Sequence, residues 1–591
     1  MNHRAFLTVF LIMAFIPGIG FAGTRDAQWQ KVDDAMRKRL PKTAIENLQP
    51  IIDGALKDKA YAEAAKAIAR RVTLEGMIQG SRPEERITRM EAEIAKAPAE
   101  IKPILTTLLA EWYWEYFQMN RWRFMQRAAM QQERLPGNDF TTWDLPRLFR
   151  EIDRQFQNAL SGADTLKKTP ISTYDDLLAK GTLSDKYRPT LYDFIAHEAL
   201  QFYTSGEQAA AKPEDSFDIP ASSPIFDPAD KFMAWRPAVT QSDSLTSRAI
   251  SLFQQLIKFH AGDTDPTAFI DDDLARLVFG KNVAYGEEKN ARLKSAFKAV
   301  ADKWPDNELS AEALYQWAQV LHDEGDLVES RSVALRGAGP FRDSVGGKEC
   351  RNLIAKIEAK SAAITTERVW NQPMPKIHVT YRNVTKVYFR AVAYDWAIFL
   401  QNNSRPESLN DQERNELLAK APDYEWSSDL PPTADYKQRE EDLPAPDKLK
   451  PGFYFIIASH DPGFGDTDNQ ITFTDVCVSD LALIVRPRNG KIEGFVLEAL
   501  SGEPVKGAEV QAWFLNGSGD RIAEPVQTTD ENGFYGLAFK TDRAYLIRVR
   551  HNGRELAAVR DYAAYKPEPE QPVSQTIFFT DRAIYRPGQT I

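Results

Sequence analysis

The spacing of apolar residues changes near residue 365 and divides the chain into two parts. Before that point apolar residues recur every three or four positions, the period of an amphipathic helix. After residue 375 they alternate with polar residues, which predicts half-buried strands. Representative stripes are Ala44, Leu48, Ile51 and Ala55 for a helix, Leu148, Ile152, Phe156 and Ala159 for another, and Ile377, Val379 and Tyr381 for a strand. The predicted fold class is therefore multidomain, α and then β.

The helical part, residues 23–365, contains one pair of helices with a readable turn. Gly325 lies where the first helix would end, and the small residues Ala318, Ser330 and Ala334 would let the two helices approach closely. The pair resembles a tetratricopeptide hairpin, although no regular period of roughly 34 residues extends along the chain. We expect an irregular helical-repeat α solenoid, with a plain helical bundle as the alternative.

The β part predicts two antiparallel β-sandwich domains, residues 370–487 and 488–565. In the second, Asn532-Gly533 is a strong signal for a tight hairpin. The spacing from Gly494 through Gly507 to Gly533 resembles a carboxypeptidase-regulatory-like sandwich, a resemblance that implies a fold and little about function. Two stretches rich in proline and polar residues, 204–240 and 402–450, predict a surface loop and an insertion.

The first 22 residues have the pattern of a secretory signal. His3 and Arg4 precede an apolar run from Ala5 to Phe15, and small residues follow up to Ala22. A membrane anchor is the alternative, but the apolar core is shorter than the roughly 20 residues that a spanning helix needs. We expect a cleaved signal peptide at 1–22, no membrane span after its removal, and an exported protein in the periplasm, at the cell surface or outside the cell.

Composition narrows the function classes. A net charge of −10 on 591 residues, with 43% hydrophobic and 27% charged residues, is typical of globular domains and argues against a nucleic-acid binder with a basic face. Two cysteines cannot supply a disulfide framework. Cys350 and Cys477 lie among apolar residues and are interpreted as buried, inert thiols. Whether they pair is left open by the sequence.

The search for chemistry predicts no catalytic, cofactor-binding or metal site. His197-Glu198 begins like a zinc-protease motif, but position 201 is Gln where a second His is required. The acidic run Asp271 to Asp273 lacks the spacing of a calcium loop and is interpreted as a solvated helix start. We therefore expect a protein that is not an enzyme and uses no cofactor.

The last residues carry the sharpest motif. Pro587-Gly588 fits the centre of a type II turn, and a new strand would begin at Ile591. Thr580-Asp581-Arg582 followed by Tyr585-Arg586-Pro587-Gly588-Gln589 resembles the opening of a macroglobulin domain in the alpha-2-macroglobulin family. We expect residues 575–591 to be the truncated start of such a domain, residues 370–487 to be macroglobulin-like, and the chain to be the front part of a longer bacterial protein.

The resemblance implies an endopeptidase inhibitor whose partners are proteases. In that family a protease cuts a bait segment and is caged, and some members carry a reactive thioester formed within Cys-Gly-Glu-Gln. Here Ser205-Gly206-Glu207-Gln208 lacks the thiol, and neither cysteine is followed by Gly-Glu-Gln. No thioester or bait segment is therefore located in this sequence, and we expect these residues to act as scaffold and docking region.

Two other function classes stay open. An envelope adaptor would bind a protein or peptide partner through its helical repeats and use the sandwiches as spacers. An enzyme acting on envelope polymers would need converging acids or a metal set, and the sequence offers neither. Sequence downstream of residue 591 discriminates, because further sandwiches with Cys-Gly-Glu-Gln favour the trap and an early stop favours the adaptor.

Overall fold

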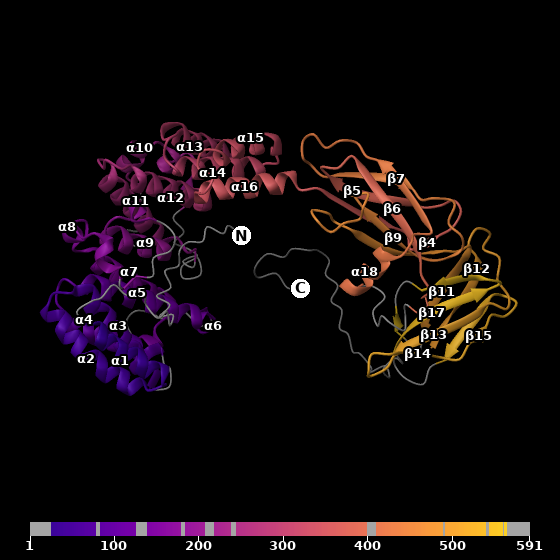
Figure 1. Cartoon of the computed structure of the whole chain (residues 1–591), viewed down its shortest axis with the longest axis horizontal. Helices are drawn as coiled ribbons and strands as arrows, with labels where there is room; N and C mark the ends of the chain where they lie inside the picture. Colours follow the sequence, from indigo (N-terminus) through magenta and orange to yellow (C-terminus); the bar gives the residue numbers. More distant parts are fainter. Residues whose placement is uncertain are drawn as a thin grey trace, which may run out of the picture. The chain divides into compact units, whose positions relative to one another are not determined.

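The computed structural model describes residues 25–78, 83–125, 139–175, 177–178, 184–206, 218–237, 244–396, 398, 409–488, 491–538, 543–558 and 561–563. These residues form two compact units, one up to Ile354 and one from Ala355 onward. Figure 1 shows that the first is helical and the second is built of strands. The predicted signal peptide at 1–22 and the macroglobulin opening at 575–591 lie outside the described residues, so both stay predictions.

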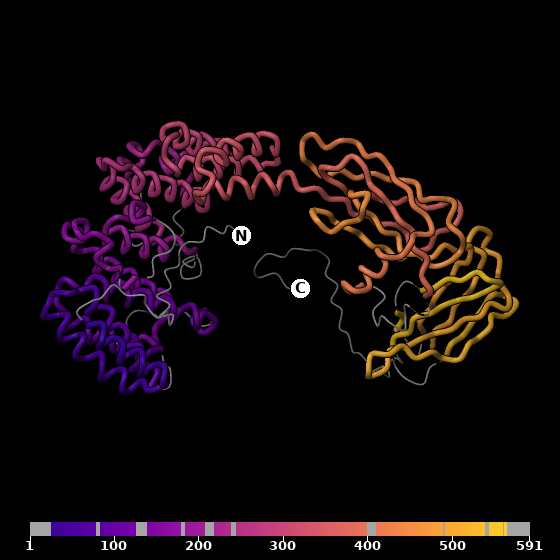
Figure 2. The backbone as a smooth tube through the Cα atoms, viewed as in Figure 1, coloured from indigo at the N-terminus to yellow at the C-terminus, as the bar shows by residue number. Residues whose placement is uncertain are grey.

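The first helices of the helical unit pack one after another along the chain (Figure 2). The stripe of Ala44, Leu48, Ile51 and Ala55 is buried, as its period predicts. Alanines on the third helix allow its neighbours to approach closely. The helices are α1 (Asp26–Arg37), α2 (Pro41–Lys57), α3 (Tyr61–Ile78), α4 (Pro83–Lys96), α5 (Lys102–Met119) and α6 (Arg121–Met125).

The later helices surround α9 (Leu191–Thr204), which is buried on almost every face. α9 packs against α5, α7 and α11. A capping box between Thr190 and Asp193 starts this helix. The other helices are α7 (Leu145–Leu160), α8 (Ala163–Leu166), α10 (Ala229–Ala234), α11 (Leu245–His260), α12 (Thr267–Val283), α13 (Lys289–Lys303), α14 (Leu309–Asp323), α15 (Leu327–Ala338) and α16 (Val345–Glu358).

The helix pair predicted around Gly325 is present as α14 and α15. Gly325 has a φ of 80° and lies between the two helices. The Ser330 hydroxyl donates a hydrogen bond of 2.7 Å to the Ala318 carbonyl, which two small residues in close contact permit. A regular repeat along the unit remains a prediction.

The predicted surface loop at 204–240 is wrong for its described part, residues 218–237. That stretch contains a short strand β1 (Ile219–Pro220), paired in parallel with β2 (Ala284–Tyr285), and helix α10. Ile225, Phe226 and Phe232 are buried. Proline-rich composition suggested a loop, but these apolar side chains pack on α12 and decide the local structure.

The β unit begins with two sheets that share one hydrophobic core around the fully buried Trp370. The five-stranded sheet has the order β4-β10-β9-β6-β7 and the three-stranded sheet the order β3-β5-β8, with only the β4–β10 pair parallel among these described strands. Their bounds are β3 (Ser361–Thr366), β4 (Val369–Trp370), β5 (Lys376–Arg382), β6 (Lys386–Ala393), β7 (Tyr424–Asp429), β8 (Arg439–Pro444), β9 (Gly452–Ser459) and β10 (Thr472–Val478).

The stretch 402–450 is not an insertion outside the sheets, as its composition suggested. Its described residues supply α18 (Asp411–Ala419) and the strands β7 and β8, which pair with β6 and β5. β8 begins with Arg439-Glu440-Glu441-Asp442, where polar residues do not alternate with apolar ones. Charged residues suit an edge strand, because they discourage pairing with other chains.

The second β part has its own core. A three-stranded sheet, β11-β12-β16, faces a six-stranded one, β14-β13-β17-β18 with β15 on β13 and β19 on β17. The bounds are β11 (Leu481–Arg488), β12 (Lys491–Glu498), β13 (Glu509–Leu515), β14 (Arg521–Ala523), β15 (Gln527–Thr528), β16 (Phe534–Ala538), β17 (Ala544–His551), β18 (Arg554–Ala557) and β19 (Tyr562–Ala563). The prediction of helices followed by antiparallel sheets is confirmed, and the sandwich and solenoid details remain predictions.

The turn at Asn532-Gly533 differs from the predicted hairpin. Only Gly533 has a positive φ, at 69°. The Asp530 carboxylate accepts hydrogen bonds of 2.9 Å from the amides of Asn532 and Phe534. The strands on either side, β15 and β16, pair with different sheets, so this turn connects two sheets. Cross-strand packing in the core outweighs the local preference of the dipeptide.

A third apolar cluster joins the two β parts to each other. Trp396 and Trp513 meet edge to face with ring centroids 5.1 Å apart, and the Arg548 guanidinium lies 5.4 Å from the Trp396 ring. Leu546, on β17 of the second part, is buried in the same cluster as Phe453 of the first. The two β parts therefore share a packed interface.

Candidate functional site

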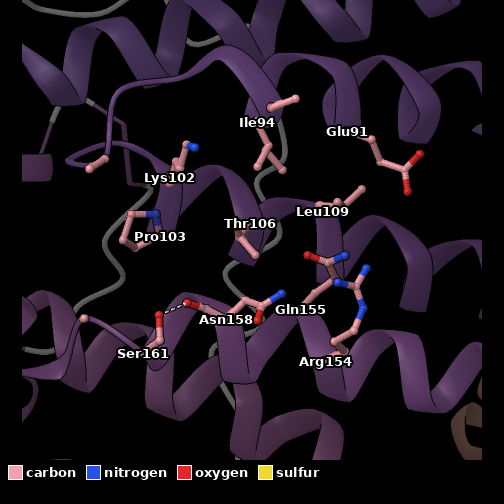
Figure 3. Close-up of a pocket in the computed structure, with 13 residues that line it drawn as sticks. Glu91, Ile94, Lys102, Pro103, Thr106, Leu109, Arg154, Gln155, Asn158 and Ser161 are labelled. Carbon is pink, nitrogen blue, oxygen red and sulfur yellow. Dashed lines mark hydrogen bonds between the residues drawn. The ribbon is translucent and has the colours of Figure 1, made fainter.

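The helical unit carries an open groove of about 540 Å³ between α4, α5 and α7 (Figure 3). α5 packs against both of the other helices, so the groove follows one side of it. Its lining comes from three regions, the end of α4, the first two turns of α5 and the last turns of α7. The lining residues are Glu91, Ile94, Ala95, Ala99, Lys102, Pro103, Thr106, Leu109, Arg154, Gln155, Asn158, Ser161 and Gly162.

One end of the groove is positively charged. Lys102 and Pro103 open helix α5, the first turn contains no acidic residue, and no side chain caps the helix. Lys102 has no ion-pair or hydrogen-bond partner among the described residues. A cation is normally unfavourable at the start of a helix, where the backbone dipole already places positive potential. This end of the groove therefore attracts an anion.

The charges at the other end of the groove are largely matched within the protein. The Arg154 guanidinium donates hydrogen bonds of 2.8 and 2.5 Å to Glu151. Glu91 accepts a hydrogen bond of 2.7 Å from the hydroxyl of Tyr113. Hydrogen bonds and the charge of Glu151 outweigh burial and raise the pKa of Arg154. Arg154 is therefore engaged within the protein, whereas the Glu91 carboxylate is held only by a neutral donor in the described chain.

Polar groups line the middle of the groove. Thr106 is only 5% exposed, and its hydroxyl has no hydrogen-bond partner in the described parts of the chain. Figure 3 places it between Lys102 and Asn158. The Ser161 hydroxyl donates a hydrogen bond of 2.7 Å to the backbone carbonyl of Asn158. Asn158 also lines the groove wall. Thr106 and Asn158 therefore give the middle of the groove a polar wall.

The groove is suited to binding and not to covalent chemistry. Its lining contains no cysteine or histidine, and Ser161 bonds only to a backbone carbonyl. Among the described residues no group of three or more His, Cys, Asp or Glu is arranged to hold a metal ion. Nucleophilic catalysis needs a base within hydrogen-bond reach of the nucleophile, and the lining supplies none.

A second concentration of polar residues lies inside the helical unit, on α9. His260, from α11, bonds through Nε2 to Asp193 at 2.9 Å and through Nδ1 to Asp263 at 2.6 Å. Burial lowers the pKa of His260, but the hydrogen bonds and charges of the two carboxylates outweigh it, so the pKa is raised. With both ring nitrogens on carboxylates, the protonated imidazole is favoured, and the ring links α9 to α11.

The next turn of α9 faces a buried acid. His197 Nε2 lies 3.1 Å from Asp272 of α12, and both side chains are buried. Burial, followed by the charges of Asp271 and Asp193, raises the pKa of Asp272 well above its ordinary value. Asp272 and Asp273 are 2% and 7% exposed, so the interpretation of this acidic run as a solvated helix start is wrong. The run occupies a helix that is covered on several sides.

Two glutamates share a hydrogen bond in the same region. Glu198 of α9 meets Glu111 of α5, and burial raises the pKa of Glu198 to about 7. Burial and the neighbouring Glu198 raise the pKa of Glu111 well above its usual range. One proton shared between two carboxyl groups is the arrangement that such a pair adopts at neutral pH. Because burial is the largest cause of both shifts, we assign the pair to the interior structure.

The residues singled out in the sequence are scattered. Cys350 and Cys477 are buried and free, and burial raises the pKa of each thiol to about 12. The bond that the sequence left open is therefore absent, and neither thiol is activated. Ser205 and Gly206 follow the end of α9, while Glu207 and Gln208 lie outside the described residues. His197-Glu198 belongs to the buried polar region of α9 and not to a metal site.

Sequence reasoning missed both the groove and the polar interior of α9. The groove has no motif, because its residues come from three helices. The sequence of α9 did indicate buried polar groups. Asp193 is followed four residues later by His197 and then by Glu198, in a helix that is mostly apolar. Polar residues at helical spacing within an apolar segment are candidates for buried pairs.

Comparisons with known proteins give one set of similarities. No family model matches the chain, and no curated protein does. No described helix is long and apolar enough to cross a membrane. Among solved structures, the chain is similar to Escherichia coli native alpha-2-macroglobulin spanning domains NIE-MG1, at 19% identity and a TM-score of 0.28, over 34% of this chain and 95% of that one.

A longer structure of the same E. coli protein, spanning domains MG0-NIE-MG1, is similar at 18% identity and a TM-score of 0.28. The match covers 34% of this chain and 64% of that one, so the chain spans just under two thirds of that structure. These bacterial alpha-2-macroglobulin fragments are what the chain resembles, and a TM-score of 0.28 supports no further argument about fold or function.

Proposed function

We propose that the chain belongs to an exported bacterial alpha-2-macroglobulin-like endopeptidase inhibitor, in which these residues serve as scaffold and docking region. The observation that carries the proposal is an order of parts. A helical unit is followed by two β parts with separate cores, and the sequence then continues into Thr580-Asp581-Arg582 and Tyr585-Arg586-Pro587-Gly588-Gln589. Each part alone is common, so the proposal rests on their succession.

The joint between the two β parts supports a scaffold role. The two β parts meet in an apolar contact formed by Trp396, Trp513 and Leu546. Inside the second part, Arg554 bonds Glu498 of the same part at 2.7 and 2.9 Å. A packed joint of this kind transmits position from one part to the next, whereas a flexible linker does not. A protease trap needs such rigid spacers, because its cage must close around the protease as a unit.

The chemistry of the sequence is consistent with a scaffold and docking role for these residues. Neither cysteine lies in a Cys-Gly-Glu-Gln element, and both thiols are buried with raised pKa values. The described residues therefore offer surfaces and spacing and no covalent trap. In the proposal, bait cleavage and capture belong to other parts of the complete protein.

The experiment uses the protein encoded by the complete open reading frame. It is mixed with trypsin, and residual activity is measured on a large protein substrate and on a small peptide substrate. A trap shields the large substrate from the protease and leaves hydrolysis of the small one intact. Equal hydrolysis of the large substrate with and without the protein would refute the proposed inhibition.

The groove favours a second candidate, an envelope adaptor that binds a protein or peptide partner through its helices. Its mixed polar and apolar lining offers a binding surface that a pure spacer does not need. The trypsin experiment separates the two functions. An adaptor leaves the large substrate unprotected and retains its partner.

A further inference from the structure

We propose that the outer face of the three-stranded sheet β11-β12-β16 is a docking face, and that the segment 577–585 of the same chain occupies it. The segment follows the second β part and lies outside the described residues. The inference goes beyond the proposed function, because it concerns how successive parts of the chain pack and holds for a trap and an adaptor alike. Three observations carry it, namely an apolar row across the face, the apolar composition of the segment, and the reach of the chain between them.

The first observation is a row of apolar side chains across three strands. Ile484 of β11 lies directly opposite Phe495 of β12, which in turn lies directly opposite Phe534 of β16. The two rings meet with centroids 5.5 Å apart and an interplanar angle of 64°, and Ile484 and Phe534 are 41% and 36% exposed. Ala482 and Leu497 form the next pair on the same face. Directly opposed side chains are close enough to form one continuous apolar surface.

This row faces away from the core of the second β part. Successive side chains of a strand point to opposite faces, and Val496 and Tyr535, which follow two members of the row, are buried in that core. On the other side the row is bordered by the charged pair Arg486 and Glu493. The outward face of an antiparallel sheet is usually polar, so a contiguous apolar surface with a polar rim indicates an interaction face.

The second observation is the composition of the segment 577–585. Docking it on the face would remove apolar surface of both from water, which is the main driving force of such contacts. The stretch before it, 564–576, is instead rich in proline and polar residues. The joint of Trp396 and Trp513 shows that successive parts of this chain already pack through aromatic side chains. The large apolar and aromatic residues of the segment are Ile577, Phe578, Phe579, Ile584 and Tyr585.

The third observation is the reach of the chain, which favours this segment over a separate partner. β19 ends at Ala563 on the six-stranded sheet, and residues 564–576 connect it to Ile577. A chain of that length spans up to roughly 40 Å when extended, whereas two packed sheets lie only about 10 Å apart. The segment can therefore reach the outer face of the other sheet. Because it is tethered, its effective concentration there exceeds that of a second copy or another protein.

The test is the rate at which trypsin cuts after Arg582, inside the segment. The whole chain is compared with a synthetic peptide of residues 575–591, and the released peptide Ala583–Ile591 is quantified by mass spectrometry early in the digestion. A protease cuts a docked segment only while it is released, so the rate follows the population of the released form. We expect the whole chain to be cut at least about tenfold more slowly than the peptide.

Matched variants assign the protection to the face. Ile484→Ser should bring cleavage after Arg582 close to the rate of the peptide. Ile522→Ser changes an isoleucine of the same exposure, 41%, on β14 of the other sheet and should leave the rate unchanged. Phe578→Ser alters the segment and leaves the sheet intact, so it tests the contact even where Ile484→Ser disturbs folding. The double variant should be cut no faster than either single one, because both changes remove the same contact.

Three results would overturn the proposal. The first is cleavage of the whole chain at the rate of the peptide, and the second is an equal effect of Ile484→Ser and Ile522→Ser. The third is protection that disappears on dilution of the protein, which would assign the face to a second copy of the chain. None of these results bears on protease inhibition, which is measured on a separate protein substrate, so failure of the docking face and failure of the trap are distinguishable.

Discussion

At the scale of single residues, the buried ion pair of His260 and Asp193 gives a sharp prediction. Asp193→Asn keeps the cap to Thr190 but removes the charge that balances the imidazolium. We expect the free energy of unfolding of the helical unit to fall by about 3 kcal/mol at pH 6, because breaking a buried pair leaves a charge uncompensated. Urea unfolding followed by circular dichroism at 222 nm measures it.

The pH dependence of this loss fixes its cause. The raised pKa of His260 means that its contribution is complete below its ordinary value and is lost as pH rises through the folded value. The deficit of Asp193→Asn should therefore shrink as pH rises from 6 towards 9 and the imidazole loses its proton. Asp263→Asn is the control, and because that side chain is 40% exposed its loss should stay below about 1 kcal/mol. An unchanged deficit at both pH values would contradict the assignment.

The glutamate pair predicts a gain of stability. The pKa of Glu198 is raised to about 7, so the wild type loses stability as pH rises from about 4.5 to that value. Glu198→Gln mimics the protonated form and should raise the unfolding free energy by roughly 2 to 3 kcal/mol at pH 8, with little change near pH 4.5. Glu46→Gln, at an exposed position on α2, should show no such pH-dependent gain. Destabilisation by Glu198→Gln at pH 8 would refute the pairing.

Sequence reasoning reached these residues without identifying their role. His197-Glu198 begins like a metal motif without its second His, and the acidic run predicted a solvated helix start, which is wrong for Asp272. Burial of an acid depends on which helices cover α12, and that information is not local to the run of three aspartates. The apolar stripes were readable because burial of a whole face imposes a period on the sequence.

At the scale of elements, two arginines hold the proline-rich stretch 218–237 against the helices. The buried Arg276 donates to the carbonyls of Ile225 at 2.6 Å and Asp227 at 2.7 Å and pairs with Asp273. Arg292 adds bonds to Ser223 and to the Asp227 carboxylate. Proline content alone predicted a loop, whereas long-range hydrogen bonds and the buried Phe232 determine the ordered path.

Arg276→Met should release this stretch. It removes the hydrogen bonds to Ile225, Asp227 and Asp273 and leaves the Asp273 carboxylate buried without its partner. We therefore expect amide hydrogens of residues 219–232 to exchange at least about tenfold faster, which corresponds to roughly 1.4 kcal/mol of local stability. Hydrogen exchange with mass spectrometry measures it. Arg236→Met, whose guanidinium bonds only nearby carbonyls at the surface, is the control. Equal exchange in both variants would refute the clamp.

The strands were predicted well where one face is buried and poorly where neither is. β5 alternates cleanly, with Ile377, Val379 and Tyr381 fully buried. The first four residues of β8 are charged and gave no signal, because its place at the sheet edge is set by backbone pairing with β5. Asn532-Gly533 marked a turn correctly but not which strands it joins, since pairing is decided by the core.

At the scale of the molecule, the joint between the two β parts should be a cooperative contact. Trp513→Ala removes the edge-to-face partner of Trp396, and we expect the free energy of unfolding of the β unit to fall by on the order of 2 kcal/mol, less than for a fully buried tryptophan. Cys477 reports on the opening, because its buried thiol donates to the Glu555 carbonyl on β18. Its reaction with a thiol reagent at pH 8 should be slow in the wild type and faster in the variant.

A matched change tests whether the joint is responsible. Trp426→Ala also removes an aromatic contact in the β unit, the stack on the buried Phe389, but lies away from the joint cluster. It should leave the reactivity of Cys477 at the wild-type rate. Equal acceleration in both variants would show general loosening of the unit and would refute a specific joint.

The central claim is that these 591 residues hold and dock but do not trap. The direct measurement is the activity of trypsin toward a large protein substrate in the presence of an equimolar amount of this chain alone. The account predicts the same hydrolysis rate as without the chain, since no bait segment or thioester is located in the sequence. Strong protection of the substrate at that ratio would contradict it.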